Sequence, residues 1–143
     1  MADELSEAIH DQVQSLSAEG DAHAERGEHD AALAKYAAAL RLLPEPWQEW
    51  EATTWLLAAV GDTHFAAQRF QAARDALSDA MHCPGAIGNP FIHFRLGQAC
   101  FELGESDRAA DELMRAYMGA GEEIFQSDDP KYLSFLKTRA KID

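Results

Sequence analysis

The chain has 143 residues, of which 47% are hydrophobic and 26% charged, and its formal net charge at pH 7 is -13. That length predicts one domain, with a core large enough to fold without a metal or a disulfide. The negative charge makes nucleic acid and anionic membranes poor partners, and the sequence has no run of about 18 apolar residues that would predict a transmembrane helix.

The first predicted hairpin spans about residues 3–46. Its first helix, from about 3 to 26, has apolar residues at helical spacing, namely Leu5, Ile9, Val13 and Leu16. A turn at Gly27 follows, then a second helix from about 29 to 43, which Pro44 ends. The exposed side of the first helix is predicted to be strongly acidic.

The second predicted hairpin spans about residues 47–85. Its first helix is predicted to begin near Trp47 and to carry Trp50 and Trp55. Such a tryptophan cluster is typical both of a packed contact between hairpins and of a recognition surface, and the sequence does not decide between them. The second helix is predicted over residues 70–81.

The third predicted hairpin spans about residues 89–121. Asn89 and Pro90 have the residue types of an N-cap and a first helical position. The first helix should end near Leu103, with Gly104 in the turn and Ser106 or Asp107 capping the next helix. A final helix is predicted over about 129–141, with an apolar face that lies on the last hairpin, formed by Tyr132, Leu133, Phe135, Leu136 and Ala140.

The three hairpins repeat one pattern of residues. Each first helix has a glycine at the same place, Gly20, Gly61 and Gly97. Small residues stand twelve positions after each glycine, at Ala32, Ala73 and Ala109, and again seven further on, at Ala39, Ala80 and Ala116. Larger apolar residues, Tyr36, Leu77 and Leu113, follow the first alanines by four positions, and Gly27, Gln68 and Gly104 occupy the turns.

This pattern resembles the tetratricopeptide repeat (TPR), a helix-turn-helix unit of about 34 residues. The resemblance implies an all-α fold, a TPR-like α-solenoid of three helical hairpins with a C-terminal capping helix, seven helices in a single domain over residues 1–143. It further suggests a small, three-repeat protein of bacterial type. The spacings between the glycines, 41 and 36 residues, are longer than the family's repeat and predict lengthened helices and connections.

Chemical motifs give little support to an enzyme. The sequence contains no nucleophile elbow, phosphate-binding glycine loop, paired-cysteine zinc site or His-Glu-x-x-His motif. The six histidines do not form a recognisable ligand set, so we expect no metal, no cofactor and no catalysis, with a metal site or an enzyme as a remote alternative. Cys83 and Cys100 are expected to be reduced structural thiols.

The TPR resemblance implies that the first helices line a concave binding groove. Counting along that face from each glycine, we predict a partner-binding set of aromatic and polar residues, with the one basic residue nearby: Asp21, Trp55, Asp62, Phe65, Phe91, Phe94, Arg95, Gln98 and Phe101. An alternative is that several of these aromatics fill gaps between repeats or under the capping helix. The scarcity of basic residues disfavours binding of the acidic tails of heat-shock chaperones.

Charge suggests the kind of partner. Residues 1–68 hold 13 acidic and 3 basic side chains, whereas residues 69–143 hold 12 and 9. This acidic half would attract a basic protein surface, although it would also keep any protein in solution.

The sequence therefore favours a cytoplasmic, non-enzymatic protein-interaction module that binds a basic or apolar protein or peptide. In the leading version it sequesters or neutralises that partner as an immunity protein does. The alternatives are a chaperone like those of class II in type III secretion and an adaptor subunit of a larger complex. Oligomeric state is left open.

Overall fold

The computed structural model describes residues 5–141, which form helices and connections without a β-strand. The described helices are α1 (Glu7–Glu25), α2 (His29–Arg41), the 3-10 helix η1 (Trp47–Glu49), α3 (Glu51–Ala66), α4 (Phe70–Ala80), α5 (Pro90–Glu102), α6 (Ser106–Ala120), α7 (Glu123–Gln126) and α8 (Pro130–Arg139). They confirm the all-α prediction of three hairpins and a C-terminal helix. The chain divides into two compact units, one up to Ala86 and one from Ile87 on.

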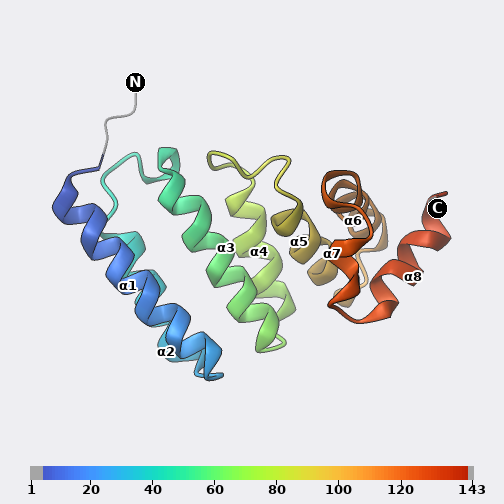
Figure 1. Ribbon diagram of the computed structural model, residues 1–143, viewed down its shortest axis with the longest axis horizontal. Helices are drawn as coiled ribbons and strands as arrows, with labels where there is room; N and C mark the ends of the chain where they lie inside the picture. Colours follow the sequence, from blue (N-terminus) through green and yellow to red (C-terminus); the bar gives the residue numbers. More distant parts are fainter. Residues whose placement is uncertain (1–4, 142–143) are drawn as a thin grey trace. The chain divides into compact units, whose positions relative to one another are not determined.

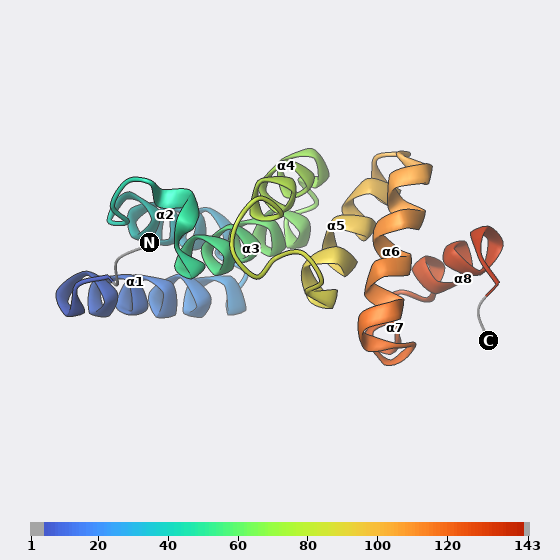
Figure 2. The ribbon, with the colours of Figure 1, turned by 90° about the horizontal axis from the view of Figure 1, so that it is seen from above.

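The first unit contains two helical hairpins that lie side by side, α1 with α2 and α3 with α4 (Figures 1 and 2). A glycine in each first helix faces a large side chain of the second. A Cβ added to Gly20 would lie 2.6 Å from the Tyr36 ring, and one added to Gly61 would lie 2.5 Å from Leu77. Because no side chain fits there, the glycines allow the paired helices to approach closely.

The second unit contains the hairpin of α5 and α6, with α7 and α8 packed on it. Gly97 and Leu113 repeat the close approach, at 2.8 Å from the added Cβ. Leu136 of α8 is fully buried, and Tyr132 is nearly so. The Phe101 ring lies edge-on to Tyr132 and Phe135, with ring centroids 5.4 and 5.1 Å apart. The predicted apolar face of the last helix therefore covers the third hairpin.

The three hairpin turns are built alike. Gly27, Gln68 and Gly104 occupy equivalent positions and all have positive φ, of 74, 62 and 79 degrees. Left-handed backbone of this kind is unstrained in glycine and costly in most other residues. Gln68 adopts it nevertheless. The repeat pattern predicted a turn at this position, whereas the residue type alone would not have predicted one.

Several predicted boundaries were wrong. The predicted start of the first helix at residues 3–4 lies outside the described residues, and within them α1 begins at Glu7, where the Ser6 hydroxyl accepts a hydrogen bond from the Ile9 N–H at 3.2 Å. Trp47 belongs to η1 rather than α3, and Trp50, in extended conformation, is the N-cap of α3. The N-cap of α6 is Glu105, without a side-chain bond, rather than Ser106 or Asp107.

The short helix α7 was not predicted at all. Its Ile124 and Phe125 are buried, whereas its length gives no helical periodicity to detect. Within residues 5–141, no helix combines the length and the apolar character needed to cross a membrane. The single-domain organisation over residues 1–143 stays a prediction.

Candidate functional site: an acidic pocket in the first unit

A pocket of about 310 Å³ lies between the two hairpins of the first unit. Its lining comes from α1, α2 and α3: Asp21, Ala24, Glu25, His29, Tyr36, Ala59, Asp62, Thr63 and Ala66. Three of these residues are alanines, and their small side chains leave the space open.

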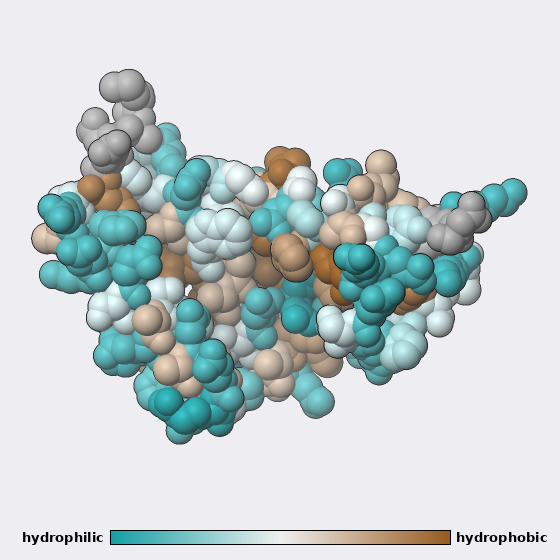
Figure 3. Space-filling model, viewed as in Figure 1, coloured by the Kyte–Doolittle hydropathy of each residue, from teal (hydrophilic) through white to brown (hydrophobic). Residues whose placement is uncertain are grey.

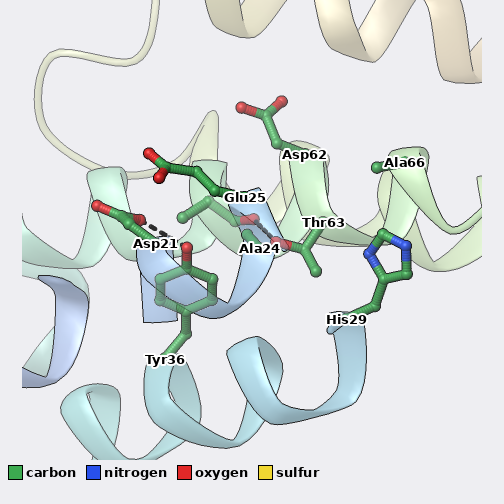
Figure 4. Close-up of a pocket in the computed structure, with 9 residues that line it drawn as sticks. Asp21, Ala24, Glu25, His29, Tyr36, Asp62, Thr63 and Ala66 are labelled. Carbon is green, nitrogen blue, oxygen red and sulfur yellow. Dashed lines mark hydrogen bonds between the residues drawn. The ribbon is translucent and has the colours of Figure 1, made fainter. Parts of the chain in front are cut away.

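The pocket is acidic. Asp21 and Glu25 stand one turn apart on α1, and Asp62 comes from α3 (Figure 4). His29, at the start of α2, lies at the other side of the pocket, and no lysine or arginine belongs to the lining. Carboxylates accept hydrogen bonds and cannot donate them when ionised, so the lining suits a cationic donor group.

Tyr36 orients one of these carboxylates. Its ring is buried, and its hydroxyl donates a hydrogen bond to Asp21 Oδ1 at 2.6 Å. Burial, and then this hydrogen bond to Asp21, raise the pKa of Tyr36 well above its usual range. The hydroxyl therefore stays protonated at physiological pH and keeps the Asp21 carboxylate in place. The Thr63 hydroxyl donates to the Ala59 carbonyl at 2.8 Å.

An ion pair joins the two hairpins beside the pocket. Arg69, in the turn after α3, lies 2.9 Å from Asp30 at the start of α2. This arginine is outside the lining of the pocket. His64 is close to it, and burial, followed by the charge of Arg69, lowers the pKa of His64.

The remaining predicted residues of the first unit do not line the pocket. The ring of Phe65 is half-buried and lies edge-on to Phe70, with centroids 5.3 Å apart. Trp55 is 58% exposed on α3. The other two tryptophans, Trp47 and Trp50, are half-buried against the apolar cluster of α1 and α2. Trp50 Nε1 donates a hydrogen bond to the Pro44 carbonyl at 2.8 Å. The structure thus splits the tryptophan cluster into two packing residues and one exposed residue.

Predicted residues of the second unit border a different pocket, of about 320 Å³. Phe91, Phe94 and Arg95 line it together with Ala120, Glu123, Ile124, Ser127 and Asp128. Phe91 is 69% exposed, whereas Phe94 is buried and lies edge-on to Phe125 at 4.9 Å. Arg95 Nη1 donates to Gln98 Oε1 at 2.7 Å, and Gln98 is fully buried.

The cover over Phe94 and Phe101 comes from α7 and α8. Phe94 and Gln98 therefore lie in the core of the second unit, and the half-buried Phe101 packs against α8, in line with the alternative that several of these aromatics fill gaps or lie under the capping helix. Their assignment to partner binding, like that of the other predicted site residues, stays a prediction.

Solved structures share this arrangement of hairpins over most of the chain. The first TPR of Spaghetti (RPAP3) bound to the HSP90 peptide SRMEEVD is 16% identical, with a TM-score of 0.68 over 90% of this chain and 92% of that one. The C-terminal TPR-containing domain of the Plasmodium falciparum FK506-binding protein PFL2275c is 16% identical, with a TM-score of 0.72 over 95% and 91%. The second TPR domain of human RPAP3, in complex with the HSP70 peptide SGPTIEEVD, is 16% identical, with a TM-score of 0.69 over 93% and 99%.

The chain has the TPR fold. At 16% identity the likeness shows the fold alone, and function has to be argued from the chemistry of the site. No protein-family model and no curated protein matches the sequence.

The set of site residues predicted from the sequence was incomplete. Glu25 and His29 line the pocket, but neither was in the predicted set. Glu25 lies four residues after Asp21, so helical spacing places it on the same face and could have identified it. His29 comes from the second helix of its hairpin, and a count restricted to first helices could not find it.

Neither metal ligands nor reactive thiols gather in the part of the chain that the structure describes. Residues 5–141 contain no group of three or more His, Cys, Asp or Glu side chains placed to hold a metal ion. Cys83 and Cys100 are both free and buried. Burial raises the pKa of both thiols, that of Cys100 to about 11.

Proposed function

We propose that this chain is a non-enzymatic protein-interaction module whose acidic pocket takes a lysine or arginine side chain from a basic segment of a protein partner. The observation that carries the proposal is the pocket lining, in which Asp21, Glu25 and Asp62 supply three carboxylates and no lysine or arginine is present.

The chemistry of the pocket matches a long cationic side chain. Its aliphatic stem would lie along Ala24, Ala59 and Ala66, and its head group would donate hydrogen bonds to the carboxylates. Asp21, fixed by the Tyr36 hydroxyl, supplies an acceptor that is oriented before the partner arrives. A bound segment then loses less free energy to ordering of the site.

The solved TPR complexes provide a useful contrast. The peptides named in two of them, SRMEEVD and SGPTIEEVD, carry several acidic residues. Three carboxylates in one pocket would repel such peptides and favour the opposite charge. The proposal therefore keeps the peptide-binding use of the fold and reverses the charge of the ligand.

The biological role that fits best is sequestration or neutralisation of a basic partner in the cytoplasm, as immunity proteins do. A chaperone of the type III secretion class is the second candidate, and the 69% exposure of Phe91 beside the pocket of the second unit favours it, because such a chaperone must hold apolar segments. An adaptor subunit would use either surface.

A charge-neutralised pair of variants tests the pocket. We expect Asp21→Asn with Asp62→Asn to weaken binding of a lysine-rich peptide at least tenfold by calorimetry, since two of three carboxylates are lost while the amide oxygen introduced at position 21 can still accept from Tyr36. The matched control, Asp11→Asn with Glu51→Gln, removes one exposed carboxylate from each of the same helices outside the pocket.

The control should change affinity by no more than about twofold at about 200 mM salt, where long-range attraction is screened. Equal losses in both double variants would show that only net charge matters and would contradict a pocket-specific role.

A further inference from the structure

The segment that precedes α5 is held by a buried chain of hydrogen bonds in the second unit. The Gly88 N–H donates to His93 Nε2 at 3.0 Å. The other ring nitrogen, His93 Nδ1, lies 2.9 Å from Glu112 Oε2 on α6. His93 is 3% exposed and Glu112 9%, so water does not compete for these bonds.

The bonds fix the protonation state of the imidazole. A backbone N–H can only donate, so Nε2 must present its lone pair to Gly88. The single proton of the neutral ring is then on Nδ1, where it is donated to the Glu112 carboxylate. The chain of bonds runs in one direction, from Gly88 through His93 to Glu112.

Protonation of the ring would break one end of this chain and strengthen the other. A proton on Nε2 would face the Gly88 N–H, and two donors cannot bond to each other. The Nδ1–H bond would meanwhile become a charge-assisted bond from an imidazolium to a carboxylate. We propose that His93 is a pH-sensitive latch that holds residues 87–89 when its ring is neutral and releases them when the ring is protonated.

The charged groups around His93 are compatible with this change in its hydrogen bonds. Besides Glu112, the ionisable groups that border His93 in its pocket are Asp111 and Arg115 of α6, which pair with each other at 3.3 Å. The Glu112 carboxylate therefore faces the ring as the nearest negative charge. Imidazoles in general change charge between about pH 5 and 8, a range that cells and compartments reach.

Release would change an exposed apolar surface. Ile87 is 76% exposed and Met118 is 78% exposed, and both line the pocket of about 510 Å³ that contains His93. Gly88, with φ of 87 degrees, joins Ile87 to the latch. Loss of the Gly88 bond frees Ile87 to move relative to Met118, so acidification would alter what this surface can bind.

Nuclear magnetic resonance of the full chain tests the latch directly. At about pH 7.5 we expect Nε2 of His93 to show the nitrogen shift of an unprotonated site and Nδ1 that of a protonated one. We expect the protection of the Gly88 amide against exchange, corrected for the intrinsic pH dependence, to be at least tenfold lower in acid, where the nitrogen shifts report a protonated ring, than at about pH 7.5.

A matched variant separates the latch from general acid effects. In His93→Gln the amide oxygen can accept from Gly88 and the amide nitrogen can donate to Glu112, and neither group titrates. This variant should keep Gly88 protected at both pH values. The proposal fails if Nε2 is protonated at neutral pH, if Gly88 keeps its protection down to the lowest pH at which the chain stays folded, or if Gly88 protection is independent of His93 protonation. It fails as well if the Gly88 amide loses protection in acid to the same extent in the folded His93→Gln variant. If that variant does not fold, the nitrogen shifts of His93 in the unaltered chain decide whether the proposal stands.

Discussion

Single residues set the distance between paired helices. Gly20, Gly61 and Gly97 each face a large side chain sixteen positions later, Tyr36, Leu77 and Leu113, and an added Cβ would come within 2.8 Å of each partner. The alanines at the other repeat positions, Ala32, Ala73 and Ala109, are fully buried. Regular spacing in the sequence made these contacts predictable.

We expect Gly61→Ala to destabilise the protein by about 1–3 kcal/mol, because the new methyl group would overlap Leu77. Leu77→Ala should itself cost about 2–5 kcal/mol through the cavity that it leaves. The double variant should cost less than the sum, since each change relieves the other. Chemical denaturation measures all three, and strict additivity would contradict the proposed contact.

The Cys100 thiol should be unreactive in the folded protein. With its pKa raised to about 11 by burial, about one thiol in a thousand is ionised at pH 8, against about a quarter for an ordinary cysteine. Labelling of a Cys83→Ser variant, which leaves Cys100 as the one thiol, should therefore require denaturant. Prompt labelling without denaturant would contradict the buried position.

The same pKa shift predicts a loss of stability in alkali. An acid whose pKa is raised on folding binds its proton more tightly in the folded chain, so its contribution is present below the unfolded pKa of about 8.5 and lost as pH rises toward 11.

At the scale of helices, the sequence predicted long periodic elements and failed for short ones. Asn89 and Pro90 begin α5 as expected, with the Asn89 side chain accepting from the N–H groups of Phe91 and Ile92. The helix α7 has four residues and no period, so only tertiary packing of Ile124 and Phe125 defines it. That packing covers Phe94. Residue spacing along the helix cannot reveal this cover, so spacing alone placed Phe94 on an open groove.

Removal of α8 should expose the core of the second unit. A chain ending at Asp128 would uncover the apolar surface that Leu136 and Tyr132 bury, and would lose the bond from the Tyr132 hydroxyl to Glu102 at 3.0 Å. We expect a much lower melting temperature or aggregation. A chain ending at Arg139 keeps α8 and serves as the control. An equally stable monomer from the shorter chain would show that α8 is dispensable.

At the scale of the molecule, charge is unevenly distributed between the two units. Residues 1–86 hold 15 acidic and 5 basic side chains, whereas residues 87–143 hold 10 and 7. Hydrophilic side chains gather over α1 in the space-filling view (Figure 3), and exposed acids there include Asp11, Glu19 and Glu25. The sequence predicted this asymmetry and two of the three pocket carboxylates. It could not predict that a buried tyrosine would fix Asp21 from the second helix of the same hairpin.

Charge at this scale should act on the rate of association. We expect Asp62→Lys to slow binding of a basic partner and to reduce its dependence on salt, because the acidic surface steers the partner before contact. Stopped-flow kinetics over a range of salt concentrations would measure this effect. An unchanged association rate would show that steering arises elsewhere on the chain.

We expect the acidic pocket of the first unit to receive a cationic side chain. The most direct measurement is a titration of the isotope-labelled protein with a short peptide that contains one lysine, compared with the same peptide containing norleucine, which keeps the apolar stem without the charge. We expect saturable changes in the amide resonances of residues that line the pocket, such as Glu25 and Asp62, with the lysine peptide alone. Changes confined to the second unit, or equal changes with norleucine, would contradict it.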